Sequence, residues 1–245
     1  MDKTFAKSTL ERFLSYPIGT SREVLEAFAA LPRAIAHFDG EKRDFVYIPG
    51  EREDRVLLVA HADTVWDILY EGEKYEQTVK ENGGVYRGKS LSCGIGADDR
   101  AGCAMLWLLK DTGHSLLIVD GEEHGQIGSR NIRENYPTLF DELNAHAYAV
   151  QLDRREHKNY KVYRLPVSRE FISFVERETG YENAGSASRT DIIVLCRDIC
   201  GVNLSIGYYD EHTEQERLVF DEWYETLTLT ERLLSGKQRR FPLVK

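Results

Sequence analysis

Three short apolar segments that run into acidic residues constrain the fold more than any other feature of the chain. They span residues 57–60, 115–119 and 147–152, and Asp63, Asp120 and Asp153 follow them. Continuous apolar segments of this length are typical of strands buried on both faces of a parallel sheet. Since most are followed by a helical pattern, the sequence predicts an α/β fold with a mixed, mainly parallel sheet and polar groups gathered at the carboxyl ends of its strands.

Other segments complete this arrangement. Apolar periodicity predicts helices over residues 5–15, 23–31 (capped by Thr20 or Ser21), 103–109, 167–179 and 217–234. A strand at 45–48 is expected to pair with the strand at 56–60 across the charged turn 51–54. A polar surface loop at 71–84, a short strand at 85–86 and two buried segments at 191–195 and 202–206 are also expected. Without repeats or a linker, one domain spanning 1–245 is the simplest organisation.

The charge and the chain ends limit the possible partners. With 41 acidic against 32 basic residues, the net charge is −9, which disfavours a nucleic-acid partner and suits carboxylates that a cation neutralises. The four cysteines lack zinc-finger spacing. The N-terminus does not resemble a signal peptide, and no apolar run approaches the ~20 residues of a membrane span. We therefore expect a cytoplasmic protein without a membrane partner.

Polar residues at the strand ends suggest a metal centre. His61 and Asp63 are two residues apart, so a strand would project both toward one ligand, although a polar turn is the simpler alternative. Small residues surround Asp98 and Asp99, where the alternative is a helix N-cap. Two imidazoles and several carboxylates suit zinc, cobalt or manganese better than calcium or magnesium. Two ions fit so many ligands better than one, because a single zinc rarely takes more than four.

Six motifs occur in an order that resembles a known superfamily. They are HADTV (61–65), GADDRAG (96–102), DGEEHGQIGS (120–129), LD (152–153), SRTDI (188–192) and NLSIGYYDEHTEQE (203–216). The chain resembles the co-catalytic dizinc exopeptidases over about residues 55–216. Its motifs are similar to those of the tripeptidase, carboxypeptidase and acylase group, whereas its size is similar to that of the single-domain aminopeptidases.

This resemblance implies a three-layer α/β/α fold and a role for each matched residue. His61 and Asp153 would hold one zinc ion, Glu123 and His212 the other, and Asp98 would bridge the two ions. A hydroxide between the ions would attack the peptide carbonyl, and Glu122, the general base, would pass the proton to the leaving amine. Asp63 would assist by orienting the ring of His61.

The chain departs from the two-domain members of this superfamily. Only positions 154–211 separate Asp153 from His212, too few for the lid and dimerisation domain that those members insert there. The oxyanion donor must then come from the core or from a partner subunit in a homo-oligomer, and Arg189, Tyr208 and Tyr209 are the candidates. Arg154 and Arg155 would either meet a substrate carboxylate or lie in a solvated loop.

The resemblance leaves several residues without a fixed role. Asp99 and Asp191 would support the ligands or cap helices, Trp66 would either wall a pocket or pack, and His114, His124 and His157 are expected not to be ligands. The expected function is a metal-dependent exopeptidase acting on short peptides. The alternatives are a deacylase acting on N-acyl amino acids and a non-catalytic metal-stabilised binding protein. Because a scaffold needs the ligands but not the base, the presence of Glu122 favours catalysis.

Overall fold

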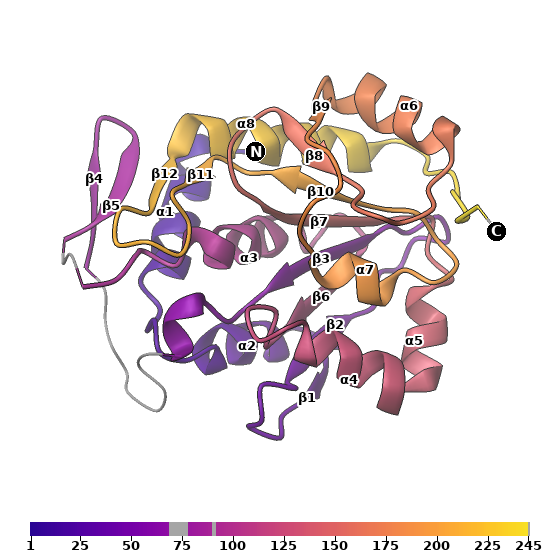
Figure 1. The fold of residues 1–245 in the computed structure, drawn as a ribbon, viewed down its shortest axis with the longest axis horizontal. Helices are drawn as coiled ribbons and strands as arrows, with labels where there is room; N and C mark the ends of the chain where they lie inside the picture. The colour runs from indigo at the N-terminus through magenta and orange to yellow at the C-terminus, as the bar shows by residue number, and fades with distance from the viewer. Residues whose placement is uncertain (69–77, 90–91, 245) are drawn as a thin grey trace.

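The computed structural model describes residues 1–68, 78–89 and 92–244, and an eight-stranded sheet forms its centre (Figure 1). The strand order is β1-β2-β6-β3-β7-β10-β8-β9. The middle four strands, β6, β3, β7 and β10, are parallel to one another, as the apolar segments predict. The strands are β1 (Ile35–His37), β2 (Phe45–Ile48), β3 (Leu57–His61), β6 (Ser115–Val119), β7 (Ala149–Arg154), β8 (Asn159–Lys161), β9 (Glu182–Asn183) and β10 (Gly201–Ser205).

Helices cover both faces of this sheet and make three layers. Alternate residues of a strand point to opposite faces, so Leu58 and Ala60 join one apolar cluster while Leu57 and Val59 join another. The first cluster includes residues of α1 (Lys3–Leu14), α2 (Arg22–Ala29), α3 (Ala97–Leu109), α6 (Arg169–Thr179) and α8 (Phe220–Ser235). The second includes residues of α4 (Ile127–Asn135), α5 (Pro137–Leu143) and α7 (Asp191–Leu195). The predicted three-layer α/β/α architecture is thus confirmed.

The predicted hairpin between residues 45–48 and 56–60 is wrong. Strand β2 pairs antiparallel with β6 and with β1, and β6 lies between β2 and β3. A turn between two strands makes them the simplest pairing partners, but here β6 lies between β2 and β3. All five residues of β6 are buried. A strand of this kind is typical of the inside of a sheet, where strands on both sides cover its edges.

A smaller four-stranded sheet, which the sequence analysis does not predict, lies beside the main one (Figure 1). Its order is β11-β12-β5-β4, from Tyr208–Tyr209, Arg217–Val219, Val85–Gly88 and Val79–Asn82. Strand β4 and its turn into β5 occupy the described part of the segment expected to be a polar surface loop. Residues 71–77 of that expectation lie outside the described residues. This sheet connects the segment after Asp63 to the loop that carries His212.

Most predicted helices are present with shifted ends. The helix expected at 103–109 begins earlier, because α3 starts at Ala97. Residues 191–195 are buried, as expected, but form the short helix α7. At the start of α2, Ser21 occupies the N-cap position, and the backbone N–H of Arg22 donates to the Thr20 hydroxyl at 3.1 Å. A 3-10 turn, η1, spans Val65–Ile68. Among the helices that the structure describes, none has both the length and the apolar character needed to cross a membrane.

Candidate metal centre

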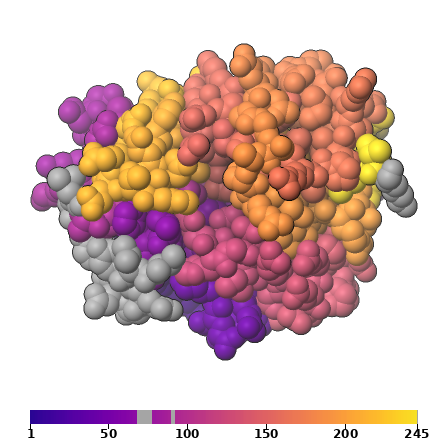
Figure 2. Space-filling view, viewed as in Figure 1, coloured from indigo at the N-terminus to yellow at the C-terminus, as the bar shows by residue number. Residues whose placement is uncertain are grey.

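The five predicted metal ligands come together at one end of the main sheet. His61 ends β3, Asp153 lies near the end of β7, and Glu123 lies in the turn after β6. These three strands are parallel, so their carboxyl ends meet at the same edge. The start of α3 contributes Asp98, and the segment between β11 and β12 contributes His212. In Figure 2, the crimson segment around 120–127 borders the orange and yellow segments around 185–215 on the face shown.

An inner group consists of His61, Asp98 and Asp153. The Nε2 atom of His61 lies 3.2 Å from Oδ1 of Asp98 and 3.4 Å from Oδ1 of Asp153. The His61 side chain is only 1% exposed. Burial opposes a charge on this imidazole, but Asp153, Asp63 and Asp98 outweigh that effect and raise its pKa well above the usual range.

Hydrogen bonds hold Asp153 in the inner group. Its Oδ2 atom accepts from Gln151 Nε2 at 2.9 Å, from the Thr190 hydroxyl at 2.9 Å and from Asn203 Nδ2 at 3.4 Å. These donors leave Oδ1, the atom that faces His61, as the oxygen available to a cation. Burial raises the pKa of Asp153 to about 6 even though the neighbouring His61 lowers it.

An outer group consists of Asp98, Glu123 and His212. The Nε2 atom of His212 lies 3.2 Å from Oδ2 of Asp98 and 2.8 Å from Oε1 of Glu123. Its side chain is 47% exposed. Hydrogen bonds with Asp98 and Glu123 raise the pKa of His212 to about 11. Asp98 therefore turns one carboxylate oxygen to each histidine, which is the geometry of a ligand shared between two sites.

Asp63 contacts both the histidine and the turn that carries the adjacent glutamates. Its Oδ1 atom lies 3.3 Å from Nδ1 of His61. Its two oxygens also accept the backbone N–H groups of Glu122 and Glu123, each at 3.1 Å. The side chain is fully buried. The contact with His61 suits the predicted orienting role. The hydrogen bonds to Glu122 and Glu123 give Asp63 a second role, which is to fix the turn that carries these two glutamates. This second role is not predicted from the sequence.

Glu122 lines the same cleft as the ligands and has an environment suited to proton transfer. Burial raises the pKa of its carboxyl well above the usual range, and the nearby Asp191 and Asp153 raise it further. Its Oε1 atom accepts a hydrogen bond from Gln126 Nε2 at 3.2 Å. A buried glutamate with a raised pKa beside a set of metal-ligating groups is a candidate for proton transfer.

Glu216 is a residue of the site that sequence reasoning missed. It is 2% exposed, and its carboxylate accepts the backbone N–H of Gly96 at 2.8 Å and that of Asp98 at 3.0 Å. A side chain at Gly94 would collide with this carboxylate. Glu216 thus ties the segment that carries Asp98 to the segment that carries His212. Glu216 is the last residue of the last matched motif. Its burial is what indicates a role in the site, and burial of a single polar residue cannot be predicted from the sequence.

Asp99 and Asp191 take the supporting places expected of them. The oxygens of Asp99 accept the backbone N–H of His61 at 3.2 Å and of Gly102 at 3.0 Å. A side chain at Gly102 would collide with Asp99. Asp191 accepts from the Ser129 hydroxyl at 2.6 Å and from Gln151 Nε2 at 3.3 Å, so it reaches Asp153 through Gln151.

Asp99 is also close enough to compete with Asp98 as a ligand. One oxygen of Asp99 lies within 4.8 Å of donor atoms of His61 and Asp153. Its oxygens already accept backbone hydrogen bonds, however, and burial raises its pKa well above the usual range. Asp98 instead faces both histidines directly, and we therefore keep Asp98 in both groups.

The remaining candidate residues divide into those that line the cleft and those that do not. A cleft of about 260 Å³ is lined by Arg154, Arg155, Arg189 and Tyr208 together with four of the five proposed ligands, Asp98, Glu123, Asp153 and His212. Tyr208 donates its hydroxyl to the Asp153 backbone carbonyl at 3.0 Å. Tyr209 instead donates to Glu222 at 2.6 Å, outside the cleft lining. Trp66 packs with Ile18 and Cys93, which matches the packing alternative.

The donor atoms suit a borderline divalent cation. Among the residues that the structure describes, two groups of three could hold an ion, namely His61, Asp99 and Asp153, and Asp98, Glu123 and His212. Neither contains His114, His124 or His157. Burial raises the pKa of Glu122, Glu123 and Asp153, which shows that the protein alone compensates their charge poorly. Cations placed among imidazole nitrogens and carboxylate oxygens would supply that compensation.

No protein-family model matches the sequence, and no curated protein matches it. Solved structures match the fold along nearly the whole chain. The aminopeptidase PepT from Bacillus cereus has a TM-score of 0.65 at 13% identity, covering 96% of this chain and 98% of that one. A tripeptidase from Staphylococcus aureus has a TM-score of 0.66 at 12% identity, with coverages of 96% and 98%.

A third match is a peptidase that forms large symmetric assemblies. The Pyrococcus horikoshii TET1 peptidase, which can form a tetrahedron or a large octahedral shell, has a TM-score of 0.62 at 15% identity, covering 94% of this chain and 99% of that one. At such low identities the likeness establishes a shared fold. Residue roles in this chain must therefore be argued from its own site.

Proposed function

We propose that the chain is a metal-dependent peptidase that removes residues from short peptides. Two divalent cations, zinc foremost and cobalt or manganese as alternatives, would bind at the inner and outer groups. His61 and Asp153 would hold the first, Glu123 and His212 the second, and Asp98 both. The observation that carries the proposal is the placement of Asp98, which turns one oxygen to each histidine at 3.2 Å. A pair of cations that share a carboxylate is typical of hydrolytic two-metal sites.

The proposed chemistry assigns proton transfer to Glu122. The bound cations would supply Lewis acidity, lowering the pKa of a water and polarising the substrate carbonyl. Glu122 would accept the proton of the attacking water on its carboxylate and deliver it to the nitrogen of the leaving amine. Asp63 would hold the Glu122–Glu123 turn and the His61 ring in place through the contacts described above.

Three neighbours of the same fold are an aminopeptidase, a tripeptidase and a peptidase, which supports the proposed reaction class. The assembly of one neighbour into a shell supports a homo-oligomer as the working form of this chain. Size-exclusion chromatography with light scattering tests that point, and a monomer at all concentrations would contradict it.

A library of dipeptides and tripeptides tests the reaction. We expect chelator-sensitive release of amino acids, with two metal ions per chain measured on the same sample. An intact library with two ions bound would overturn the peptidase proposal. In that case, hydrolysis of N-acetyl amino acids would indicate the deacylase alternative, and its absence the metal-stabilised binding protein.

A further inference from the structure

Basic side chains line the metal-centre cleft together with the carboxylates. They are Arg154, Arg155, Lys161 and Arg189. Two of them already have acidic partners. Arg154 lies 3.5 Å from Glu156, and Arg155 is paired with Glu211. The positive charge of these arginines is therefore used within the protein itself.

Lys161 is a buried cation without an acidic partner. It ends β8 and is 7% exposed. Its ammonium donates to the backbone carbonyl of Ala187 at 2.8 Å and to the Ser188 hydroxyl at 3.3 Å, and it lies 5.8 Å from the ring centre of Tyr163. Within residues 1–68, 78–89 and 92–244 it forms no ion pair. Burying a charge without a counter-charge is costly, so an anion bound beside Lys161 would offset part of that cost.

Arg189 is a second available cation on the same segment. Its side chain is exposed, and it forms no ion pair with any residue in the described part of the chain. The segment is fixed at both sides of Arg189, because Lys161 binds Ala187 and Ser188 while Thr190 binds Asp153. The Lys161 ammonium and the backbone on both sides of Arg189 are therefore held relative to a proposed metal ligand.

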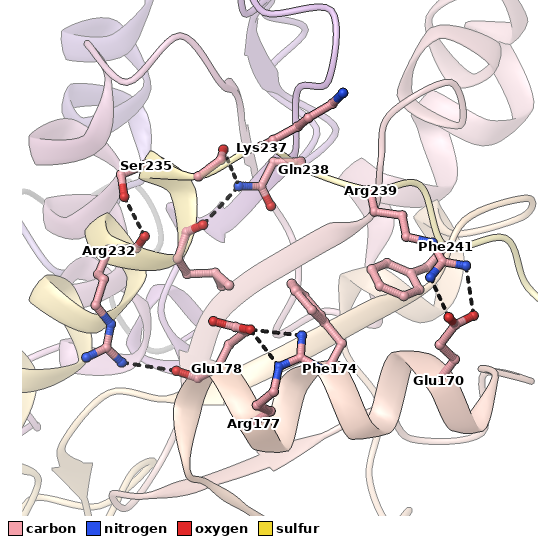
Figure 3. Close-up of a pocket in the computed structure, with 12 residues that line it drawn as sticks. Glu170, Phe174, Arg177, Glu178, Arg232, Ser235, Lys237, Gln238, Arg239 and Phe241 are labelled. Carbon is pink, nitrogen blue, oxygen red and sulfur yellow. Dashed lines mark hydrogen bonds and ion pairs between the residues drawn. The ribbon is translucent and has the colours of Figure 1, made fainter.

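A second groove shows how basic residues are partnered elsewhere in the described part of the chain. The groove between α6 and the end of α8, of about 380 Å³, is also rich in arginine (Figure 3). There Arg239 is paired with Glu170, Arg177 lies 2.9 Å from Glu178, and Arg232 donates to the Glu178 carbonyl at 3.1 Å. Arg239 and Arg177 of that groove pair with glutamates, whereas Arg232, like Lys161, donates to a backbone carbonyl. Lys161 differs from Arg232 because it is buried and lines the cleft of the proposed metal ligands.

We infer that Lys161 and Arg189 bind a carboxylate of the substrate, so that the cleft selects anionic short peptides. The inference rests on the proposed function and names its substrate class. Two bound cations would neutralise the ligand carboxylates, and the charges left to face a substrate would then be the basic ones. An ammonium and a guanidinium that line one cleft together suit a carboxylate, which accepts charge-assisted hydrogen bonds from both kinds of group. This carboxylate is either the C-terminal group of a peptide or an Asp or Glu side chain.

Matched peptides distinguish these two sources. Ala-Ala-Ala is compared with its C-terminal amide, and Ala-Glu-Ala amide with Ala-Gln-Ala amide, using the zinc-loaded protein. We expect kcat/KM to favour the carboxylate member of one pair by about ten- to a hundredfold, the typical value of hydrogen bonds to a charged group. The pair that shows the preference identifies the source. Equal kcat/KM within both pairs would overturn the inference.

Substitutions of Lys161 and Arg189 test whether these two residues cause the preference for a carboxylate. In Lys161→Met and in Arg189→Gln, the ratio of carboxylate to amide kcat/KM should fall toward one. The matched controls Lys158→Met and Arg164→Gln remove exposed cations that do not line the cleft, and they should keep the full ratio. A preference that persists in both cleft variants would overturn the inference. Arg189 is exposed, so its variant decides the question if Lys161→Met does not fold.

A binding measurement separates this inference from the proposed function. Calorimetry on the zinc-loaded Glu122→Gln variant, with N-acetylalanine and with N-acetylalanine amide, measures binding without turnover under either reaction. If no peptide is hydrolysed but N-acetylalanine binds about ten- to a hundredfold more tightly than its amide, with the difference lost in Lys161→Met or Arg189→Gln, the carboxylate site stands while the peptidase proposal fails. Equal binding of the two compounds would overturn a site for a C-terminal carboxylate, and equal binding of N-acetylglutamic acid amide and N-acetylglutamine amide would overturn a site for a side-chain carboxylate.

Discussion

The inner and outer groups of the metal centre share Asp98 but have different surroundings. In the inner group the His61 side chain is 1% exposed, and Asp153 is held by three side-chain donors. In the outer group the His212 side chain is 47% exposed. Its segment is fastened by surface ion pairs, Arg155 with Glu211 and Arg217 with Asp210. Exposed pairs of this kind add little stability.

The fold itself fixes the positions of the inner ligands, whereas the position of His212 in the outer group would depend more on a bound ion. The inner ligands end parallel strands and are positioned before any cation arrives, so they should bind one tightly. The outer group depends on a segment that Glu216 and the Tyr208 hydroxyl tie to the inner part of the site. We therefore expect the two proposed ions to differ in affinity, with the inner one tighter and slower to exchange.

Substitution of the proposed general base should have the largest effect on turnover and should leave the difference in affinity between the two ions unchanged. Glu122→Gln should reduce kcat by about two to four orders of magnitude, the usual contribution of general acid–base catalysis. Metal content, measured by mass spectrometry of the same sample, should remain at two ions per chain. Unchanged turnover would remove Glu122 from the mechanism, and loss of an ion would show that it is a ligand instead.

Removal of one histidine at a time tests the asymmetry directly. His61→Ala should weaken the tighter binding step by more than about a hundredfold, since even residues that only orient a ligand contribute about ten- to a hundredfold. His212→Ala should weaken the looser step and leave the tighter one intact. Both variants should keep the circular-dichroism spectrum of the parent. Equal loss of both ions in either variant would mean that Asp98 couples the groups too strongly to be treated as two.

Glu216 offers a smaller test, because it binds the backbone of Asp98 and touches no proposed ion. In Glu216→Gln one of the two oxygens that accept backbone N–H groups is replaced by an NH2 group, which cannot accept. The backbone of Asp98 should then be held less firmly, so the affinities for both proposed ions should fall by about tenfold or more. The outer affinity should fall more. Gln215→Glu serves as the matched control at an exposed neighbour. Unchanged zinc titrations in Glu216→Gln would show that this carboxylate does not position Asp98.

Stability after chelation should fall as the pH rises through the neutral range. The pKa values of Asp153 and Glu216 are raised by burial to about 6 and about 8. The folded chain therefore holds protons that the unfolded chain releases from about pH 4 upward, so the free energy of unfolding decreases between about pH 4 and 8. Zinc should reverse this trend, because its ligands must be deprotonated. Denaturant titrations with chelator and with zinc measure both curves, and parallel curves would contradict the prediction.

Three of the proposed ligands could be predicted from the sequence because they follow apolar strands. Local patterns show where a strand ends, and parallel strands bring those ends together, so His61, Glu123 and Asp153 converge as expected. Asp98 and His212 follow no such strand, and the motifs that contain them were the signal that placed them in the site. Strand order was less accessible. The insertion of β6 between β2 and β3 is a long-range pairing that no local pattern encodes. Burial of isolated polar residues was equally hidden, which is why Glu216 and Lys161 were found only in the structure.

A zinc titration of the chelator-treated protein tests the two-group arrangement most directly. Calorimetry should resolve two equivalents, a tight step followed by a weaker one, and hydrolysis of Ala-Ala-Ala measured at each point should rise to its maximum with the second. A single equivalent that gives full activity, or no zinc binding at all, would contradict the arrangement in which Asp98 serves two ions.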